Sequence, residues 1–164
     1  MAITAWSAFW FLPFALPISI WVAWNDMKFM KIPNMAVLAL MVVFVVIGLI
    51  ALPFPEYLWR LLSFVVILAI GFALNMIRAI GAGDAKFAAA MAPFVALGDL
   101  PDFLYMFAAI VLAAFITHRL ARRSDTIKKL TPDWESWTRR DFPMGLALGS
   151  TLAIYLITGA LWGA

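Results

Sequence analysis

The chain has 164 residues, of which 66% are hydrophobic and 13% charged, and its formal net charge is +3. A soluble domain of this size could not bury so much apolar surface, so the composition excludes an ordinary globular protein and predicts an integral membrane protein. The absence of cysteine excludes disulfides, thiolate catalysis and a cysteine-ligated zinc site.

Charges and turn residues divide the sequence into six apolar segments. They predict an all-α bundle of six transmembrane helices in a single membrane-embedded domain, residues 1–164. In chain order, the predicted helices cover about 4–24, 35–53, 59–79, 84–99, 102–120 and 142–162. The first segment lacks the basic start of a signal peptide, so we expect a retained helix. The fourth is short against the roughly 20 apolar residues of a spanning helix.

The basic residues decide the predicted orientation. With six spans, eleven of the twelve Lys and Arg residues fall in segments 25–34, 78–86 and 119–141, and only Arg60 lies opposite. Basic residues concentrate on the cytoplasmic side of membrane proteins. Six spans with both termini on the periplasmic side are therefore favoured, since five spans would place the basic loop outside.

Seven of the nine acidic residues have an ordinary structural explanation. Three lie beside prolines in short outer turns and four in the cytoplasmic loop 121–141, namely Glu56, Asp99 and Asp102, then Asp125, Asp133, Glu135 and Asp141. Asp141 could also cap the last helix. Trp134 and Trp137 in the same loop predict either an interfacial helix lying on anionic lipid or a solvated loop.

The two remaining acids, Asp26 and Asp84, abut apolar helices on the predicted cytoplasmic side. Taken singly, Asp84 could cap a helix N-terminus, and Asp26 could be an interfacial charge beside Lys28. Together they lie at similar depth, where ionisable groups are costly and tend to face the interior of the bundle. Two close carboxylates share one proton, so one can activate water while the other protonates a leaving amine. The pair predicts an aspartyl endopeptidase.

Several nearby residues are expected to shape this site. Gly81 and Gly83 permit unusual backbone angles and close approach of a substrate chain. Lys86 either favours the ionised carboxylate electrostatically or anchors the helix at the membrane surface. The others are expected to shape turns and close packing, namely Pro33, Asn34, Pro143 and Gly145. We expect no metal and no cofactor.

Three motifs occur in a fixed order along the chain. They are Asp26 followed by a basic stretch and Ile32-Pro33-Asn34, then Gly81-Ala82-Gly83-Asp84-Ala85-Lys86, then Pro143-Met144-Gly145. In this order and at these helix edges they resemble the type IV prepilin peptidases, a family of GxGD membrane aspartyl proteases. The resemblance covers nearly the whole chain and implies that Asp26 and Asp84 are the catalytic aspartates.

The implied substrate is the helix of a prepilin or pseudopilin, whose short basic leader is cut at the cytoplasmic face of the bacterial inner membrane. Bifunctional members of the family carry a cysteine-containing insertion linked to N-methylation, which this chain lacks. It therefore resembles the short, single-function members associated with Flp (tight-adherence) pili, and N-methyltransferase activity is not expected. The implied partners are the lipid bilayer and pilus-assembly proteins, with no nucleic acid.

Two functions of other classes remain as alternatives. One is a small proton-coupled membrane carrier with Asp84 as its relay, although the sequence shows no duplicated pair of broken helices. The other is a non-catalytic scaffold of a pilus or secretion assembly. Substrate flux into vesicles would identify a carrier, and an inactive but inserted protein would identify a scaffold.

Overall fold

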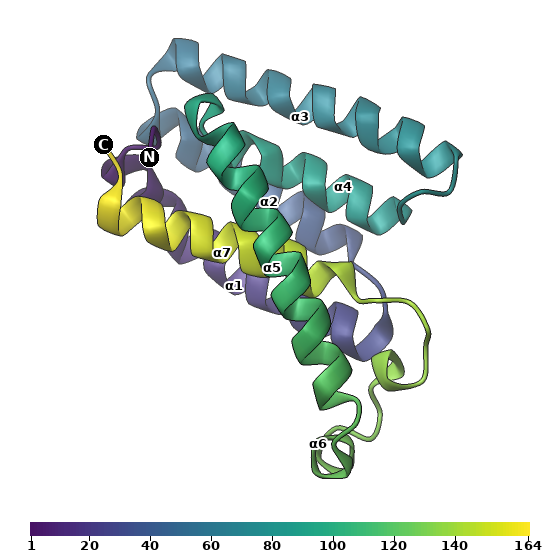
Figure 1. The fold of residues 1–164 in the computed structure, drawn as a ribbon. Coiled ribbons are helices and arrows are strands. Elements are labelled where there is room, and N and C mark those ends of the chain that lie inside the picture. Colours follow the sequence, from purple (N-terminus) through teal and green to yellow (C-terminus); the bar gives the residue numbers. More distant parts are fainter.

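The computed structural model describes residues 1–164, and the chain is helical throughout, without a β-strand. The α-helices are α1 (Ala5–Phe29), α2 (Asn34–Ala51), α3 (Phe54–Met76), α4 (Ala82–Met91), α5 (Leu100–Ala121), α6 (Asp125–Leu130) and α7 (Met144–Trp162) (Figure 1). Three short 3₁₀ helices complete the fold: η1 (Ala92–Phe94), η2 (Leu97–Asp99) and η3 (Glu135–Trp137).

Five helices are long and apolar enough to cross a membrane, namely α1, α2, α3, α5 together with η2, and α7. This confirms an all-helical, multi-pass membrane protein. The predicted fourth helix, 84–99, is not continuous, because it consists of the ten-residue α4 followed by η1 and η2. Pro93 lies within η1, and a proline cannot donate the backbone hydrogen bond that would continue an α-helix.

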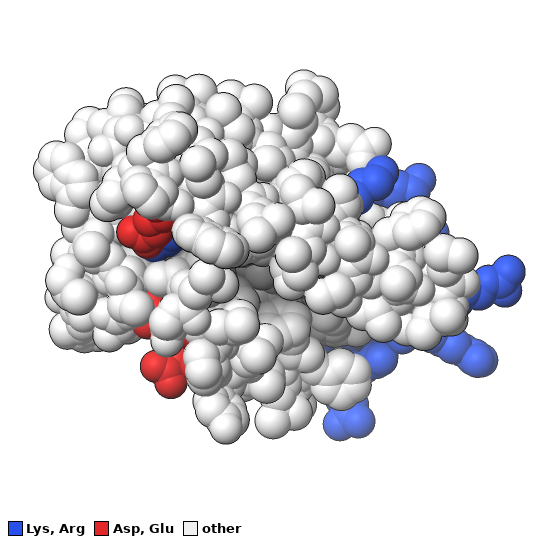
Figure 2. Space-filling view, turned by 90° about the horizontal axis from the view of Figure 1, so that it is seen from above, with Lys and Arg blue, Asp and Glu red and all other residues white.

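The bundle has two ends that differ in the chain segments they hold. The terminal end holds residues 1–4, 52–53, 95–99 and 163–164, and the loop end holds residues 30–33, 77–81 and 122–143. Both chain termini lie together (Figure 1), where Ala164 donates a backbone hydrogen bond to the Ile3 carbonyl at 3.1 Å. On the face drawn in Figure 2, most of the visible Lys and Arg side chains gather at one end, and the visible Asp and Glu side chains lie toward the other.

Two helix ends differ from those predicted. Helix α1 continues to Phe29, so Asp26 lies within its last turn and not beyond it. Helix α3 begins at Phe54, which places Glu56 in its first turn and not in an outer loop. Pro55 fits there, because the first turn of a helix needs no backbone N–H donor. A charge or a proline ends an apolar run without ending the helix.

Packed aromatic rings, two pairs edge-to-face and one stacked, hold the first three helices and η1 together. The Phe11 ring lies 4.9 Å from that of Phe94, and the Phe44 ring lies 5.4 Å from Phe94 and 5.5 Å from Tyr57. Such pairs add to the stabilisation by buried area alone. They fix α4 against α1, α2 and α3, because η1 follows α4 directly.

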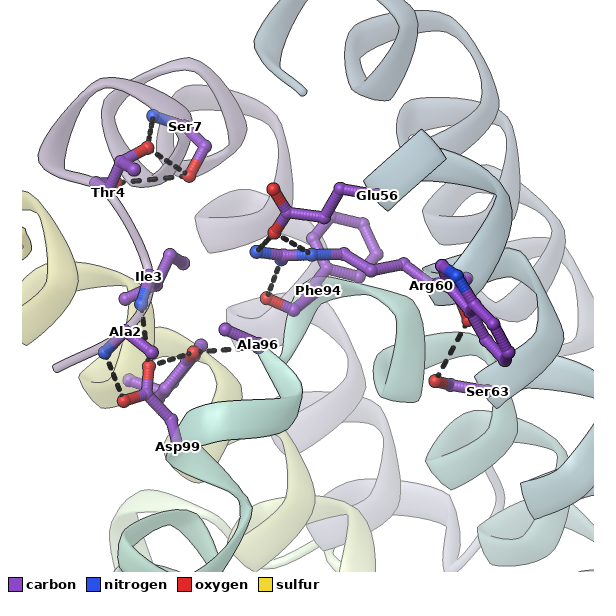
Figure 3. Close-up of polar contacts among 12 residues, drawn as sticks. Ala2, Ile3, Thr4, Ser7, Glu56, Arg60, Ser63, Phe94, Ala96 and Asp99 are labelled. Atoms are coloured by element: carbon purple, nitrogen blue, oxygen red, sulfur yellow. Dashed lines mark hydrogen bonds and ion pairs between the residues drawn. The ribbon is translucent and has the colours of Figure 1, made fainter. Parts of the chain in front are cut away.

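A network of hydrogen bonds closes the terminal end (Figure 3). Asp99, expected in a simple turn, is buried, and its carboxylate accepts hydrogen bonds from the backbone N–H groups of Ala2 and Ile3. The Tyr155 hydroxyl donates to Asp99 Oδ2 at 2.8 Å and accepts from the Ala96 N–H at 3.0 Å. The N-terminus, η2 and α7 are thereby joined.

The single cation at this end, Arg60, is also buried. Its Nη2 lies 2.6 Å from Glu56 Oε1, and its Nη1 donates to the Phe94 carbonyl at 3.1 Å (Figure 3). A buried charge is tolerated when it is paired and hydrogen-bonded. Arg60 therefore ties α3 to the end of η1.

Replacing Tyr155 by phenylalanine is expected to lower the free energy of unfolding by about 1–3 kcal/mol, because the Ala96 N–H and the Asp99 carboxylate each lose a buried partner. Thermal unfolding in detergent micelles measures the loss. Tyr105→Phe is the matched control, since Tyr105 is 78% exposed and makes no hydrogen bond through its hydroxyl. Equal melting temperatures for the two variants would contradict a stabilising role for the network.

Candidate active site

A cavity of about 690 Å³ opens at the loop end of the bundle, and both Asp26 and Asp84 line it. The cavity lies among the end of α1, the α1–α2 turn, the α3–α4 turn, the start of α4 and the segment before α7. Its other polar and charged lining residues are Lys31, Asn34, Asn75, Arg78, Lys86, Arg139 and Asp141. Two acids from separate helices therefore share one cavity rimmed mainly by cations.

Asp26 projects from the last turn of α1 toward the start of α7. The residue is only 5% exposed, and its Oδ2 accepts a hydrogen bond of 2.6 Å from the Gly145 N–H. Gly145 lies in the first turn of α7, where backbone N–H groups lack an intrahelical acceptor and the helix dipole favours a negative charge. The start of α7 thus holds this carboxylate in place.

Gly145 meets a steric requirement at this contact. A Cβ at this position would lie 2.8 Å from Asp26 Cβ and 2.9 Å from Asp26 Oδ2, closer than real Cβ contacts. Only glycine allows α7 to approach Asp26 at this distance without a shift of either helix. Gly145 is expected from the sequence to permit close packing near Asp26 and Asp84, and the structure shows this packing as a direct contact between Gly145 and Asp26.

Asp84 lies in the first turn of α4 and is half-buried. Gly81 is the N-cap residue, and no side chain caps this helix, so Asp84 does not act as the cap. A Cβ on Gly81 would lie 2.7 Å from Asp84 Oδ2, which shows that this carboxylate lies against the Gly81 backbone. At Gly83, by contrast, a Cβ would make an ordinary contact of 3.4 Å with Ile32.

Helix α4 packs between α3 on one side and α2 and α7 on the other. Gly71 of α3 permits this, because a Cβ there would lie 3.0 Å from Ala85 Cβ. Since α7 also contacts Asp26 through Gly145, the packing of α4 against α7 brings the two acid-bearing segments to one cavity.

The remaining predicted site residues divide into two groups. Asn34 and Lys86 line the cavity, and Lys86 Nζ donates to Asn34 Oδ1 at 3.3 Å, which joins the starts of α4 and α2. Lys86 forms no ion pair with Asp84. Pro33 and Pro143 are the N-cap residues of α2 and α7 and do not line the cavity. Their role is to start those helices.

Sequence reasoning missed five polar residues of the cavity wall. Lys31, Arg78, Arg139 and Asp141 counted only as loop or orientation residues, and Asn75 only as part of a helix. Arg78 adopts a left-handed backbone with φ of 58°, in a turn where Asn75 Nδ2 donates to the Ile80 carbonyl at 2.9 Å. Asp141 does not cap α7, whose N-cap is Pro143. No local spacing indicated these positions, because they depend on how the loops fold back.

The arrangement can carry out general acid–base chemistry on water. Two carboxylates in one cavity repel each other when both are ionised, so the pair tends to hold a single proton. An ionised carboxylate can accept a proton from water, and a protonated one can donate to a carbonyl oxygen or to a leaving amine. Both functions are needed to hydrolyse a peptide bond.

Comparison with known proteins bears on the same residues. A model of the type IV leader peptidase family matches residues 13–118, a stretch that contains Asp26 and Asp84 and ends before Gly145. No curated protein and no solved structure matches the chain. The matched stretch covers more than half of the chain, and it includes Asp26 and Asp84 of the cavity. The protein therefore belongs to the type IV leader peptidase family.

Proposed function

We propose that the protein is an aspartyl endopeptidase that removes the basic leader of a prepilin or prepilin-like protein, with Asp26 and Asp84 as its catalytic pair. The observation that carries the proposal is that both carboxylates line one cavity at the cation-rich end of the bundle. The family match supports leader cleavage in general. The catalytic pair, the side of the membrane on which it acts and the prepilin substrate are our proposals and are not given by the family match.

In the proposed reaction, a water molecule lies between the two carboxylates. The ionised carboxylate takes a proton from this water as its oxygen attacks the scissile carbonyl carbon. The protonated carboxylate donates a hydrogen bond to the carbonyl oxygen, and the tetrahedral intermediate then collapses as a proton passes to the leaving amine. The two carboxylates end with their protonation states exchanged.

We also propose six membrane crossings, with the loop end in the cytoplasm of a bacterial cell and both termini outside. Residues 82–99 support this, because Asp84 lies at the loop end while Asp99 binds the N-terminus at the other end. The short α4 is packed against α2, α3 and α7, so protein and not lipid surrounds most of it. The bias of cations to the loop end agrees with a cytoplasmic location.

Single cysteines test this orientation, since the chain has none of its own. Asp102 and Thr126 are both exposed and lie near opposite ends, in α5 and α6. A membrane-impermeant thiol reagent added to intact spheroplasts is expected to label Asp102→Cys and to spare Thr126→Cys until the membrane is opened. Labelling of Thr126→Cys in intact spheroplasts would contradict a cytoplasmic loop end.

The function itself is tested with purified protein in liposomes and a prepilin with a basic leader that ends in glycine. We expect the leader to be released and the new N-terminus to begin directly after it. Mass spectrometry of that product is expected to show no added methyl group when a methyl donor is supplied. An intact substrate combined with ion or solute flux would instead support the carrier, and an intact substrate without flux would support the scaffold.

A further inference from the structure

The segment Trp134–Phe142, here named the strap, joins the cytoplasmic loop to the start of α7. Aromatic rings fasten it to two helices. Trp134 meets Trp24 of α1 at a ring distance of 5.0 Å and stacks on Trp137 at 5.6 Å, and Trp137 stacks on His118 of α5 at 5.4 Å. The Phe142 ring packs edge-to-face against the His118 ring, at a ring distance of 5.9 Å.

Burial distinguishes this stack from two incidental loop tryptophans. Trp137 is 8% exposed and His118 is 1% exposed, and the Trp137 indole N–H donates to the Thr131 carbonyl at 3.0 Å. The sequence left two alternatives for Trp137, an interfacial helix on lipid or a solvated loop. Both require an exposed indole ring, so the burial of Trp137 contradicts both. The only α-helix of the loop, α6, ends before it at Leu130, and Trp137 is the last residue of the short 3₁₀ helix η3.

Hydrogen bonds from Arg119 in the last turn of α5 and from its C-cap residue Arg122 hold the second half of the strap. Arg122 Nη1 donates to the Arg139 carbonyl at 2.8 Å, and Arg119 Nη2 donates to the Arg140 carbonyl at 3.1 Å. Within the bundle, α5 buries only two of its residues, Phe103 near its start and His118 near its end. His118 and the strap are thus the main attachment of α5 at the loop end.

The strap leads directly into the proposed active site. Arg139, Asp141 and Phe142 line the cavity, and three residues after Phe142 the Gly145 N–H donates to Asp26. Such a short connection transmits a displacement of the strap to Gly145. The geometry points to His118, Trp134 and Trp137 as positioning residues, which hold the strap so that Gly145 keeps Asp26 in its working orientation. This inference rests on the proposed endopeptidase activity.

Trp137→Ala tests the inference against two matched variants. It is expected to lower kcat for leader cleavage by about ten- to a hundredfold with little change in KM, because misplacement of a catalytic group by about 1 Å has effects of that order. Trp137→Phe keeps an aromatic ring on His118 and is expected to retain most of the activity. Trp162→Ala removes an exposed tryptophan at the terminal end and is expected to change neither constant.

Hydrogen exchange supplies a readout that does not depend on activity. A peptide covering residues 143–148 contains the Gly145 N–H, and its exchange is expected to accelerate in Trp137→Ala but not in Trp162→Ala. If Trp137→Ala does not accumulate, Arg122→Gln removes the exposed hydrogen bond to the strap and is expected to show the same two changes at smaller size.

Two results would overturn the inference. One is unchanged exchange at residues 143–148 in the strap variant tested, whatever its activity. The other is a loss of activity in proportion to the loss of folded protein, with Trp137→Phe no better than Trp137→Ala. A wild-type protein that cuts no prepilin would count against the proposed function, while the exchange data would still decide whether the strap orders Gly145.

Discussion

Replacing either Asp26 or Asp84 by asparagine is expected to reduce leader cleavage by at least about 10³-fold, near the upper range for loss of a positioned acid or base. Asparagine has nearly the same shape as aspartate but cannot take up or release a proton under these conditions. The amide oxygen of Asp26→Asn can still accept the Gly145 N–H, so the bundle is expected to stay folded. The double variant is expected to lose little more than either single variant, because the pair acts as a unit.

Asp102→Asn provides the control for this experiment. Asp102 is an exposed acid in the first turn of α5, at the opposite end of the bundle from the cavity. Prepilin processing is measured for each variant and normalised to the amount of inserted protein. Only Asp102→Asn is expected to process the prepilin as well as the unmodified protein. Substantial cleavage by either Asp26→Asn or Asp84→Asn would show that the two-aspartate mechanism is wrong.

Gly145→Ala is expected to lower the rate of leader cleavage by about 10²-fold while both aspartates remain present. The added methyl group would lie 2.8 Å from Asp26 Cβ and 2.9 Å from its Oδ2, so the carboxylate or the start of α7 must shift. A displacement of about 1 Å at a catalytic group reduces rates by roughly this factor. Single-turnover cleavage of a prepilin in liposomes measures the effect on the chemical step.

Gly98→Ala is the matched control, because the change is the same and the crowding is comparable. A Cβ at Gly98 would lie 2.8 Å from Ala2 Cβ, but at the terminal end, away from Asp26 and the cavity. We expect a modest decrease in melting temperature and nearly normal cleavage. Similar losses of activity in Gly98→Ala and Gly145→Ala would indicate general damage to the bundle and would argue against a specific role for the Gly145–Asp26 contact.

Local sequence signals predicted five of the six long helices and were poor at their ends, while the fourth predicted helix is replaced by α4, η1 and η2. The mean apolarity of each long segment identifies a spanning helix, because lipid imposes that composition along its whole length. The ends follow other rules. Helix α1 continues through Asn25 and Asp26 and ends at Phe29, and its C-cap residue Met30, which has a left-handed backbone, donates its N–H to the Asp26 carbonyl. The segment 84–99 breaks at Pro93, a position that hydropathy alone ignores.

The candidate site was predictable in part for a related reason. Asp26 and Asp84 stood out because a membrane segment rarely contains an acid without a function. The cavity wall was not predictable, since Arg139 and Asp141 reach it only through the strap and its stacking on His118. Asp99 looked like a turn residue, and its partners Ala2 and Tyr155 are remote in sequence.

The sequence by itself determined the class of protein, the basic loop end and the two acids, since composition, charge bias and motif order are properties of the chain alone. Only the tertiary structure decided how those acids are held. The hydrogen bond from Gly145 to Asp26 joins residues 119 positions apart, and Lys86 meets Asn34 across 52 positions. Such contacts depend on which helices become neighbours, and that follows from packing across the whole bundle and not from any local pattern.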